Sequence, residues 1–557
     1  MTSWPCCANR WPRCKRSWTN WANNAKRGAP AALGRLSLVR NSLVSQIRHA
    51  LTIKREDDFA KWYQEVISAA DLAEESGVRG CMVIKPWGYG IWERIQRLMD
   101  DRIKAAGVQN CYFPLFIPLA NFTREAEHVE GFAKEMAVVT HHRLISDGKG
   151  GLIPDPAAKL EEPLVVRPTS ETIIGDAMAR WIQSWRDLPL LTNQWANVVR
   201  WEMRTRMFLR TSEFLWQEGH TAHENRDEAL AETHRALEMY RACAEDDLAL
   251  PVIAGEKPEN ERFPGAVETW SIEAMMQDGK ALQAGTSHYL GTNFAHAAGI
   301  QFQDREGAQQ FCHTTSWGVS TRLIGGVIMT HGDDDGLRVP PAIAPQQIVI
   351  IPMLREAPED AELLAYCEGV RAALAGQSAL GERVRVILDK KPGKAAAKRW
   401  DWVRKGAPVI IEVGPRDMAE GKLAVLRRDQ LWNAENGKPA FSYPAHADFV
   451  AGAGALLETI QTALYEEART RRDANIRRDI VTLDALADHF ENSGKYPGWV
   501  EVEWAKPTDA ALDKIVETLK IHKLTIRNVP RASAEASGQC IFTGNRAVER
   551  IIVARAY

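Results

Sequence analysis

One arginine-bearing segment has the residues to bind a polyphosphate. Arg200-Trp201-Glu202 ends an apolar run, and a polar basic loop separates it from a second strand-like run, Phe208–His220. A guanidinium group can hold phosphate oxygens through two parallel hydrogen bonds, while a cationic loop neutralises the remaining charge. The pattern therefore suits a triphosphate. Two solvated strand edges would contain the same residue types, so both interpretations stay open at this point.

A second segment, Arg167-Pro168-Thr169-Ser170-Glu171-Thr172, has the residues for a small polar ligand. Thr169 and Glu171, two positions apart in a loop, can point at one molecule, and the carboxylate can accept hydrogen bonds from a cationic amine. The same residues also form a good N-terminal cap for a helix over 172–185, which is the more economical interpretation of this segment alone.

Two further segments combine small and polar residues. Gln283–Gly291 has the composition of a small-residue turn carrying Gln283, Thr286 and His288, although a lone histidine more often has a structural role. Thr315–Arg322 contains a glycine that permits close approach, and Arg322 opens an apolar stretch that is compatible with a helix.

The run His331-Gly332-Asp333-Asp334-Asp335-Gly336 has the composition of a divalent-metal loop. It lacks the ligand spacing of a calcium loop. We therefore expect a solvated turn here rather than a metal site.

Apolar periodicity predicts the elements that must hold these segments in place. In the first half of the chain it favours helices over 59–67, 91–106 and 228–248, and strands over 80–84, 110–117, 164–167, 191–201 and 211–220. After Pro340-Pro341, strand-like runs at 347–352, 383–388 and 408–413 alternate with helical patterns at 360–375 and 395–405. This alternation predicts a small α/β domain with a mostly parallel sheet, followed by a helix over 452–477.

Composition narrows the class of protein. The 557 residues are 45% hydrophobic and 25% charged, which is typical of several globular domains and excludes a disordered chain, a collagen or a small disulfide scaffold. No apolar run approaches about 18 residues, so no membrane span and no membrane partner are expected. The nine cysteines form no CxxC pair, which favours free thiols in a reducing compartment.

The charge is unevenly distributed. Residues 1–55 hold eleven Lys and Arg and no acidic residue, whereas the rest of the chain has 59 basic and 72 acidic residues. Any RNA contact of the acidic part must therefore be a local basic patch. We expect residues 1–49 to be disordered and to result from a start codon assigned too early; a transit peptide or a basic RNA-binding arm would have a similar composition.

Taken together and in order, these segments resemble the prolyl-tRNA synthetases of the archaeal/eukaryotic-like form, a family of class II aminoacyl-tRNA synthetases. The similarity runs from about residue 53 to residue 557. It is carried by Arg79–Tyr89 at the start of the catalytic domain, Tyr112–Pro118 as motif 1, Glu125–Phe132 after it, Arg200–His220 as motif 2, Ser316–Arg322 as motif 3, and Gly414–Asp417 and Arg427–Asp429 in the anticodon-binding domain.

The resemblance implies that proline and ATP form prolyl-adenylate, and that the prolyl group then moves to the 3′ end of tRNA(Pro). It implies that Arg200 bridges the proline carboxylate and the α-phosphate, and that Arg322 holds the γ-phosphate. The implied ATP-binding residues are Arg200, Glu202, Arg210, Thr211, Gln283, Thr286, Ser320 and Arg322. The implied proline-binding residues are Thr169, Glu171, Arg200, Trp216, Glu218, His220 and His288. Mg²⁺ is expected with the ATP phosphates, without assigned protein ligands.

The resemblance also implies the architecture. We expect an α+β catalytic domain on an antiparallel sheet over 50–341, an α/β anticodon-binding domain over 342–450 and a small α+β C-terminal domain over 451–557. We expect a cytoplasmic homodimer, with import into an organelle as a minor alternative. Many bacterial-form relatives insert an editing domain between motifs 2 and 3. Only 64 residues separate Glu218 from Gln283 here, so no such domain fits.

Two rival functions remain at this stage. Another class II synthetase of the same subgroup, for threonine, histidine or glycine, would share the fold; the Thr-Ser-Glu and Trp-Gln-Glu-Gly-His stretches argue against it. A non-catalytic paralogue that binds tRNA would have lost the ATP-binding arginines. Arg200, Glu202, Gln283 and Arg322 are all present, which argues against this second rival.

The C-terminal segment predicts a metal content that departs from the family. Relatives of this form commonly carry a four-cysteine zinc site there, whereas Cys540 is the only cysteine after Cys367, and Thr543 stands where a second cysteine would fall. Four thiolates cannot be assembled, so we expect the domain to fold by packing alone. Metal analysis of the purified protein should find no zinc; one zinc ion per chain would contradict this prediction.

Overall fold

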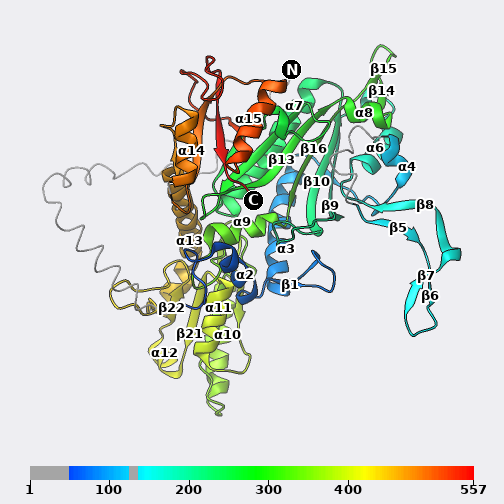
Figure 1. The fold of residues 1–557 in the computed structure, drawn as a ribbon. Coiled ribbons are helices and arrows are strands. Elements are labelled where there is room, and N and C mark those ends of the chain that lie inside the picture. The colour runs from blue at the N-terminus through cyan, green and yellow to red at the C-terminus, as the bar shows by residue number, and fades with distance from the viewer. Residues whose placement is uncertain (1–48, 125–135, 493) are drawn as a thin grey trace. The chain divides into compact units, whose positions relative to one another are not determined.

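A computed structural model describes residues 49–124, 136–492 and 494–557 (Figure 1). The expected disorder of residues 1–49, apart from His49, and the segment Glu125–Phe132 lie outside the described residues. The chain divides into two compact units, and residues 49–431 with 441–557 form the larger one. The described part of the other unit, 432–440, is a short turn closed by a bridge between Trp432 and Pro439.

The larger unit is organised by an eight-stranded sheet in the order β26-β11-β12-β13-β16-β10-β9-β3. Every neighbouring pair is antiparallel except β3 and β9, so the expected antiparallel sheet is confirmed. Helix α7 (Arg226–Ala242) covers one face of it (Figure 1). The strands are β3 (Gln109–Asn110), β9 (Leu190–Val199), β10 (Glu213–His223), β11 (Val252–Glu256), β12 (Glu268–Met275), β13 (Ala281–Gly291), β16 (His313–Ser320) and β26 (Val529–Pro530).

One predicted turn is a strand. Gln283–Gly291 lies within β13, hydrogen-bonded to β12 on one side and β16 on the other. Its small residues reflect crowding rather than a bend, because a Cβ at Gly285 would come within 2.9 Å of Val319. The local composition suggested a turn, but pairing with two neighbours holds the segment extended.

The core beside α7 is built by helices whose apolar stripes the sequence predicts. Asp58 caps α2 by accepting a hydrogen bond from the amide of Lys61, and α2 buries Trp62, Tyr63 and Val66. The main helices around this core are α2 (Phe59–Ala69), α3 (Pro86–Ala105) and α9 (Arg322–His331). Helix α9 is buried along its whole length after its first residue, Arg322.

A smaller three-stranded sheet, β4-β8-β5, stands beside the main one, with the hairpin β6–β7 extending from it (Figure 1). These strands are β4 (Phe116–Pro118), β5 (Val138–His141), β6 (Leu144–Ser146), β7 (Leu152–Pro154) and β8 (Lys159–Val166). The neighbouring short elements are α4 (Leu119–Arg124), α6 (Glu171–Trp181), α8 (Asn293–Ala298), β14 (Gln301–Gln303) and β15 (Gln309–Phe311), whereas the hairpin of β1 (Ala73–Glu75) and β2 (Met82–Ile84) lies next to α2.

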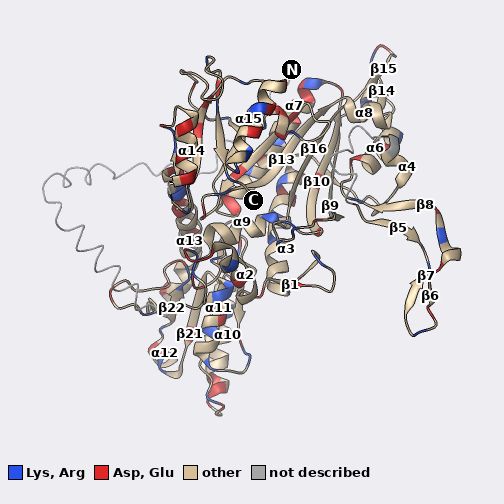
Figure 2. Cartoon of the chain, in the orientation of Figure 1, with Lys and Arg blue, Asp and Glu red and all other residues tan. Residues whose placement is uncertain are grey.

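A second core surrounds a four-stranded sheet, β20-β17-β21-β22. Its first three strands are parallel and β22 is antiparallel, which confirms the βαβαβ prediction. The elements are β17 (Ile348–Pro352), α10 (Asp360–Ala375), β18 (Ser378–Ala379), β19 (Glu382–Arg383), β20 (Val386–Leu388), α11 (Ala395–Lys405), β21 (Val409–Val413), α12 (Pro415–Glu420) and β22 (Ala424–Arg427). Basic side chains gather on α11, whereas acidic ones gather on α14 (Leu483–Asn492) (Figure 2).

Helix α13 (His446–Ala474) runs through the expected boundary at 450/451, and its first half packs into the second core through Phe449, Leu457 and Leu464. A third core follows, around the sheet β23-β24-β27-β25. Its elements are β23 (Ile476–Arg477), α14 (Leu483–Asn492), β24 (Trp499–Trp504), α15 (Asp509–Ile521), β25 (Thr525–Ile526) and β27 (Glu549–Ala554). Cys540 is buried in this core; the absence of zinc stays a prediction.

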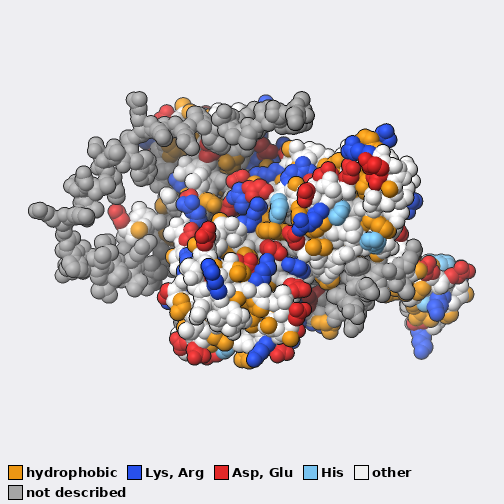
Figure 3. Space-filling model, turned by 90° about the horizontal axis from the view of Figure 1, so that it is seen from above, with side chains coloured by type: hydrophobic (Ala, Val, Ile, Leu, Met, Phe, Trp, Pro, Cys, Tyr) orange, Lys and Arg blue, Asp and Glu red, His pale blue; other side chains and the backbone are white. Residues whose placement is uncertain are grey.

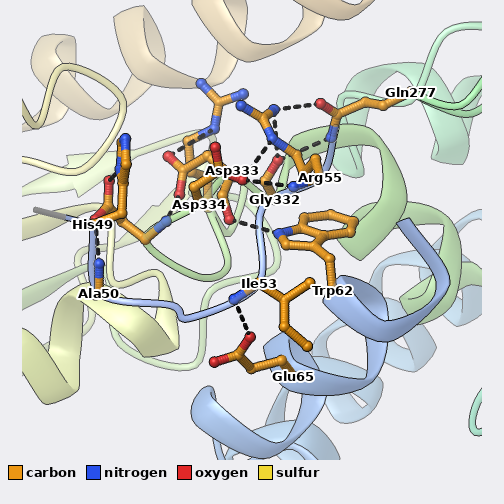
Figure 4. A network of polar contacts seen from close by, with 12 residues as sticks. His49, Ala50, Ile53, Arg55, Trp62, Glu65, Gln277, Gly332, Asp333 and Asp334 are labelled. Carbon is orange, nitrogen blue, oxygen red and sulfur yellow. Dashed lines mark hydrogen bonds and ion pairs between the residues drawn. The ribbon is translucent and has the colours of Figure 1, made fainter. Parts of the chain in front are cut away.

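The run at 331–336 is neither a metal loop nor a solvated turn. The carboxylate of Asp333 pairs with both terminal nitrogens of Arg428, which follows β22, and its backbone oxygen accepts the indole N–H of Trp62. Asp334 binds Arg55, and Asp335 binds the segment at His49 (Figure 4). The turn is thus a structural junction between the first core, the start of the described chain and the second core.

This junction predicts a difference in stability between two neighbouring arginines. Arg428 is buried and its guanidinium also donates to the oxygen of Val403, so Arg428→Ala leaves Asp333 without its main partner. Loss of one member of such a pair costs about 3–5 kcal/mol. Arg427, which pairs with Asp429 and is partly exposed, is the matched control, with an expected loss below about 1 kcal/mol. Thermal unfolding compares the two; equal shifts would contradict the prediction.

Candidate active site

A cavity of about 270 Å³ lies over the strands β10, β16 and β13 on the face opposite α7. The antiparallel register places its floor in three cross-strand rows. His220, Ser316 and His288 form the first row, and Glu218, Gly318 and Thr286 form the second. Trp216 and Ser320 form the third. Along β10, alternate residues therefore face the cavity, whereas on β13 a bulge interrupts the alternation, so that Gln283 and Thr286, three positions apart, both line it.

Two guanidinium groups line one part of the cavity. Arg200, directly after β9, donates from Nε to the oxygen of Pro168 at 2.9 Å and lies over the rings of Phe214 and Trp216. Arg322, the first residue of α9, donates from Nε to the oxygen of Leu209 at 3.2 Å. Burial, with the charges of Arg210 and Arg200, lowers the pKa of Arg322 to about 10. Arg322 is still charged at neutral pH, so this part of the cavity suits a polyanion.

Carboxylates line the other part. Glu171, at the start of α6, accepts a hydrogen bond from the Thr169 hydroxyl, and the buried Glu218 accepts hydrogen bonds from Ser170 and Gln194. Ser170 precedes α6, but its side chain does not cap the helix, so the capping interpretation of this segment is wrong. The serine hydroxyl is committed to Glu218 instead. This part of the cavity suits a cationic amine.

Two histidines close the acidic part, and their pKa values shift in opposite directions. Burial disfavours the imidazolium form of His220, but the hydrogen bond that its ring donates to Glu218 and the charges of Glu171 and Glu218 outweigh it, so the pKa of His220 is raised. Burial, with the charge of His220, lowers the pKa of His288 to about 3. His288 is therefore neutral at physiological pH. Its ring packs on Phe263 and its Nδ1 lies 3.1 Å from the Thr269 hydroxyl.

The cavity brings together most of the residues that the sequence singled out. Those that line it are Thr169, Glu171, Arg200, Trp216, Glu218, His220, Gln283, Thr286, His288, Ser320 and Arg322. Three expected ATP-binding residues, Glu202, Arg210 and Thr211, do not line it. They lie in the loop between β9 and β10, where Glu202 accepts from the amide of Arg204 and faces Arg210 at 3.7 Å, and where Thr211 is buried.

Sequence analysis missed several lining residues. Phe214 lies within the run Phe208–His220 without an assigned role, and Phe263 follows the short turn η4 (Glu259–Glu261), where no periodicity marks it. Ser316 lies within motif 3, also without an assigned role, whereas Gly318 in the same motif is expected to permit close approach. Spacing along a strand could have identified such residues, because a strand at the floor of a cavity exposes every second side chain to it.

Comparison with known proteins decides the family. Residues 157–331 match the class II tRNA synthetase core domain of the G, H, P, S and T group, and residues 347–435 match an anticodon-binding domain. A proline–tRNA ligase from Erythrobacter litoralis is 73% identical over 92% of this chain and all of its own length. This chain belongs to the proline–tRNA ligase family. A member from Paramagnetospirillum magneticum is 56% identical over 91% of this chain and 99% of its own.

Solved structures of the same family share the fold. A prolyl-tRNA synthetase from Cryptosporidium parvum, in complex with L-proline and AMP, superposes with a TM-score of 0.79 at 35% identity, covering 91% of this chain and 97% of its own. The same enzyme with halofuginone and AMPPNP gives a TM-score of 0.80 at 36% identity and the same coverage. The proline–tRNA ligase assignment excludes the rival substrates threonine, histidine and glycine that the sequence left open.

The proline–tRNA ligase fold accounts for the interval between motifs 2 and 3. The residues between Glu218 and Gln283 form the end of β10, then α7, β11 and β12, all parts of the main sheet or its cover.

Within the described ranges, no helix is long and apolar enough to cross a membrane. Across the same residues, no three or more His, Cys, Asp or Glu side chains cluster as metal ligands would.

Proposed function

We propose that this cavity binds proline and ATP and joins them as prolyl-adenylate. One observation carries the proposal: a single cavity is lined by two carboxylates, Glu171 and Glu218, and by two guanidinium groups, Arg200 and Arg322, and the charges of both carboxylates act on Arg200. An amino acid zwitterion and a triphosphate need this arrangement, with the amine toward the carboxylates and the carboxylate toward the arginine that also faces the phosphates.

In this proposal Arg200 holds the proline carboxylate next to the α-phosphate. Attack of a carboxylate oxygen on the α-phosphorus forms the mixed anhydride and releases pyrophosphate. Negative charge builds up on the α-phosphate oxygens during attack, and a guanidinium already oriented by Pro168 and two aromatic rings stabilises it without reorganising. Arg322 holds the γ-phosphate, so the two arginines keep the triphosphate bent.

The acidic part selects the amine. Glu218 and Glu171 receive the secondary ammonium of proline, with Thr169 as a further polar contact, while the neutral His288 and the Phe263 ring form an uncharged wall for the pyrrolidine. A small pocket of this kind separates ligands that differ by one methylene by only about 1–3 kcal/mol. Alanine and cysteine are therefore expected to react weakly as well.

Mg²⁺ has no ready-made protein site here. The buried Glu273, on β12 below the arginines, is committed to Lys257 and Arg527, and Glu202 faces Arg210. The described residues thus do not fit a dedicated metal cage, and we expect the ion to arrive bound to the ATP phosphates, as is usual for Mg²⁺. No step is assigned to it.

The second core is proposed to bind tRNA(Pro). Lys390, Lys391 and Lys394 are exposed in the loop after β20, at the carboxyl edge of the parallel strands and at the start of α11, and phosphate contacts need exposed cations of this kind. On the face drawn in Figure 3, acidic and basic side chains are otherwise interspersed, which fits local contacts rather than a global attractive field. The homodimer and the cytoplasmic location stay predictions.

The proposed function predicts a substrate preference. In ATP–pyrophosphate exchange with the purified chain, proline should give the fastest exchange, alanine and cysteine slow exchange, and threonine, histidine and glycine none above background. Exchange that is fastest with another amino acid would contradict the proposal. No exchange with any of them would favour a paralogue that binds tRNA without activating an amino acid.

The role proposed for Arg200 predicts a selective loss. Arg200→Ala removes the charge that faces the developing negative charge, so proline-dependent exchange should fall on the order of 10²–10³-fold while the melting temperature changes little. Arg305→Ala is the control, because Arg305 is exposed and pairs with Glu224 away from the cavity. Near-normal exchange by Arg200→Ala would overturn the assigned role.

A further inference from the structure

Glu218 is held by a chain of hydrogen bonds that begins outside the cavity. The side chain of Gln194, fully buried on β9, donates from Nε2 to Glu218 Oε1 at 2.5 Å and to the hydroxyl of Ser170 at 2.9 Å. Ser170 in turn donates to the same carboxylate oxygen. On its other side, Gln194 Oε1 accepts the backbone N–H of Phe113 at 3.1 Å.

The orientation of this amide is dictated by its partners. The N–H of Phe113 can only donate and an ionised carboxylate can only accept, so the carbonyl of Gln194 must face Phe113 and the NH₂ must face Glu218. A glutamine side chain satisfies both partners at once, because its carbonyl oxygen accepts and its NH₂ donates. The two donors at Oε1 leave Glu218 Oε2 for His220, at 3.1 Å, and for the cavity.

We infer that Gln194 is a positioning residue for proline selection: it holds the Glu218 carboxylate in the orientation that receives the substrate amine. This inference rests on the proposed function of the cavity. Gln194 itself does not line the cavity, so it acts only through Glu218 and Ser170. It also connects the acidic part of the cavity to the Tyr112–Pro118 segment, because its Oε1 accepts the backbone N–H of Phe113, whose oxygen in turn accepts from Arg167.

The opposite face of the same two strands supplies a matched control. Gln217 is buried to the same degree, donates from Nε2 to Asn193 Oδ1 at 2.7 Å and accepts from the Tyr240 hydroxyl at 2.6 Å. Strand alternation points it away from the cavity, so it does not contact Glu218. Gln217→Leu and Gln194→Leu thus remove the same amide, at the same burial, from opposite faces.

The test is exchange kinetics with proline and ATP varied separately. Gln194→Leu should raise the KM for proline about tenfold or more and leave the KM for ATP within about twofold, because a buried carboxylate loses one of its donors. Gln217→Leu should leave both constants near those of the unsubstituted chain, although both variants lower the melting temperature. Equal effects of the two variants on the KM for proline would overturn the inference, as would an equal rise in the KM for ATP after Gln194→Leu.

Gln194→Glu gives a second test, the pH dependence of the KM for proline, which would not change if Gln194 only stabilised the fold. Repulsion from Glu218 raises the pKa of the introduced carboxyl, so at low pH it keeps a proton and donates as the amide does. As pH rises the proton is lost, two carboxylates face each other, and the KM for proline should rise relative to the unsubstituted chain between about pH 6 and pH 9. A pH-independent ratio would overturn the inference, even where Gln194→Leu fails to fold.

Measurement of the unsubstituted chain at each pH accounts for the other titratable groups around Glu218. These groups are Arg167, Glu171, Arg200, His220, Tyr240 and, beyond His220, His288. If the unsubstituted chain shows no proline-dependent exchange, the proposed function fails and the inference fails with it. If that chain exchanges normally and the Gln194 variants behave like Gln217→Leu, only the inference fails.

Discussion

The register of β10 against β16 and β13 is the constraint on which the site depends. It places Glu218, Gly318 and Thr286 in one row and His220, Ser316 and His288 in the next. A slip of one residue would turn every one of these side chains into the core and bring Gln217 and Trp317 into the cavity. Gly219 helps to prevent such a slip, since the Trp317 ring fills the space where its Cβ would be.

Side chains of both charge signs are buried beside these strands, and they differ in what offsets the cost of their burial. Glu218 is balanced by neutral donors from Gln194 and Ser170 and by His220, which leaves the carboxylate able to bind an amine. Burial lowers the pKa of Arg322, and the charges of Arg210 and Arg200 lower it further, whereas the charges of Glu171 and Glu218 act to raise the pKa of Arg200. An anionic ligand beside Arg322 relieves the repulsion from the neighbouring arginines. A polyphosphate is therefore favoured next to the arginines rather than next to Glu171 and Glu218.

Buried ion pairs connect the three cores, in addition to the strand β26, which joins the C-terminal region to the main sheet. Arg428 of the second core binds Asp333 at the end of α9, the helix that Arg322 begins. Arg527 of the third core binds Glu273 on β12, which also pairs with Lys257. Such pairs contribute little net stability, because desolvation offsets the attraction, but a lost partner is costly. They therefore specify how the domains dock against the back and the end of the catalytic sheet.

Local physics explains what the sequence by itself determined. Helices α10 and α11 begin and end at the predicted residues, and the order of the synthetase motifs identifies the family, because periodicity and motif residues are properties of adjacent positions. Long-range pairing decided the rest. Pairing with neighbouring strands holds Gln283–Gly291 extended, and the ion pair with Arg428 connects Asp333 to the second core. Likewise, Gln194 contacts Glu218 across 24 positions, a proximity that strand register alone creates.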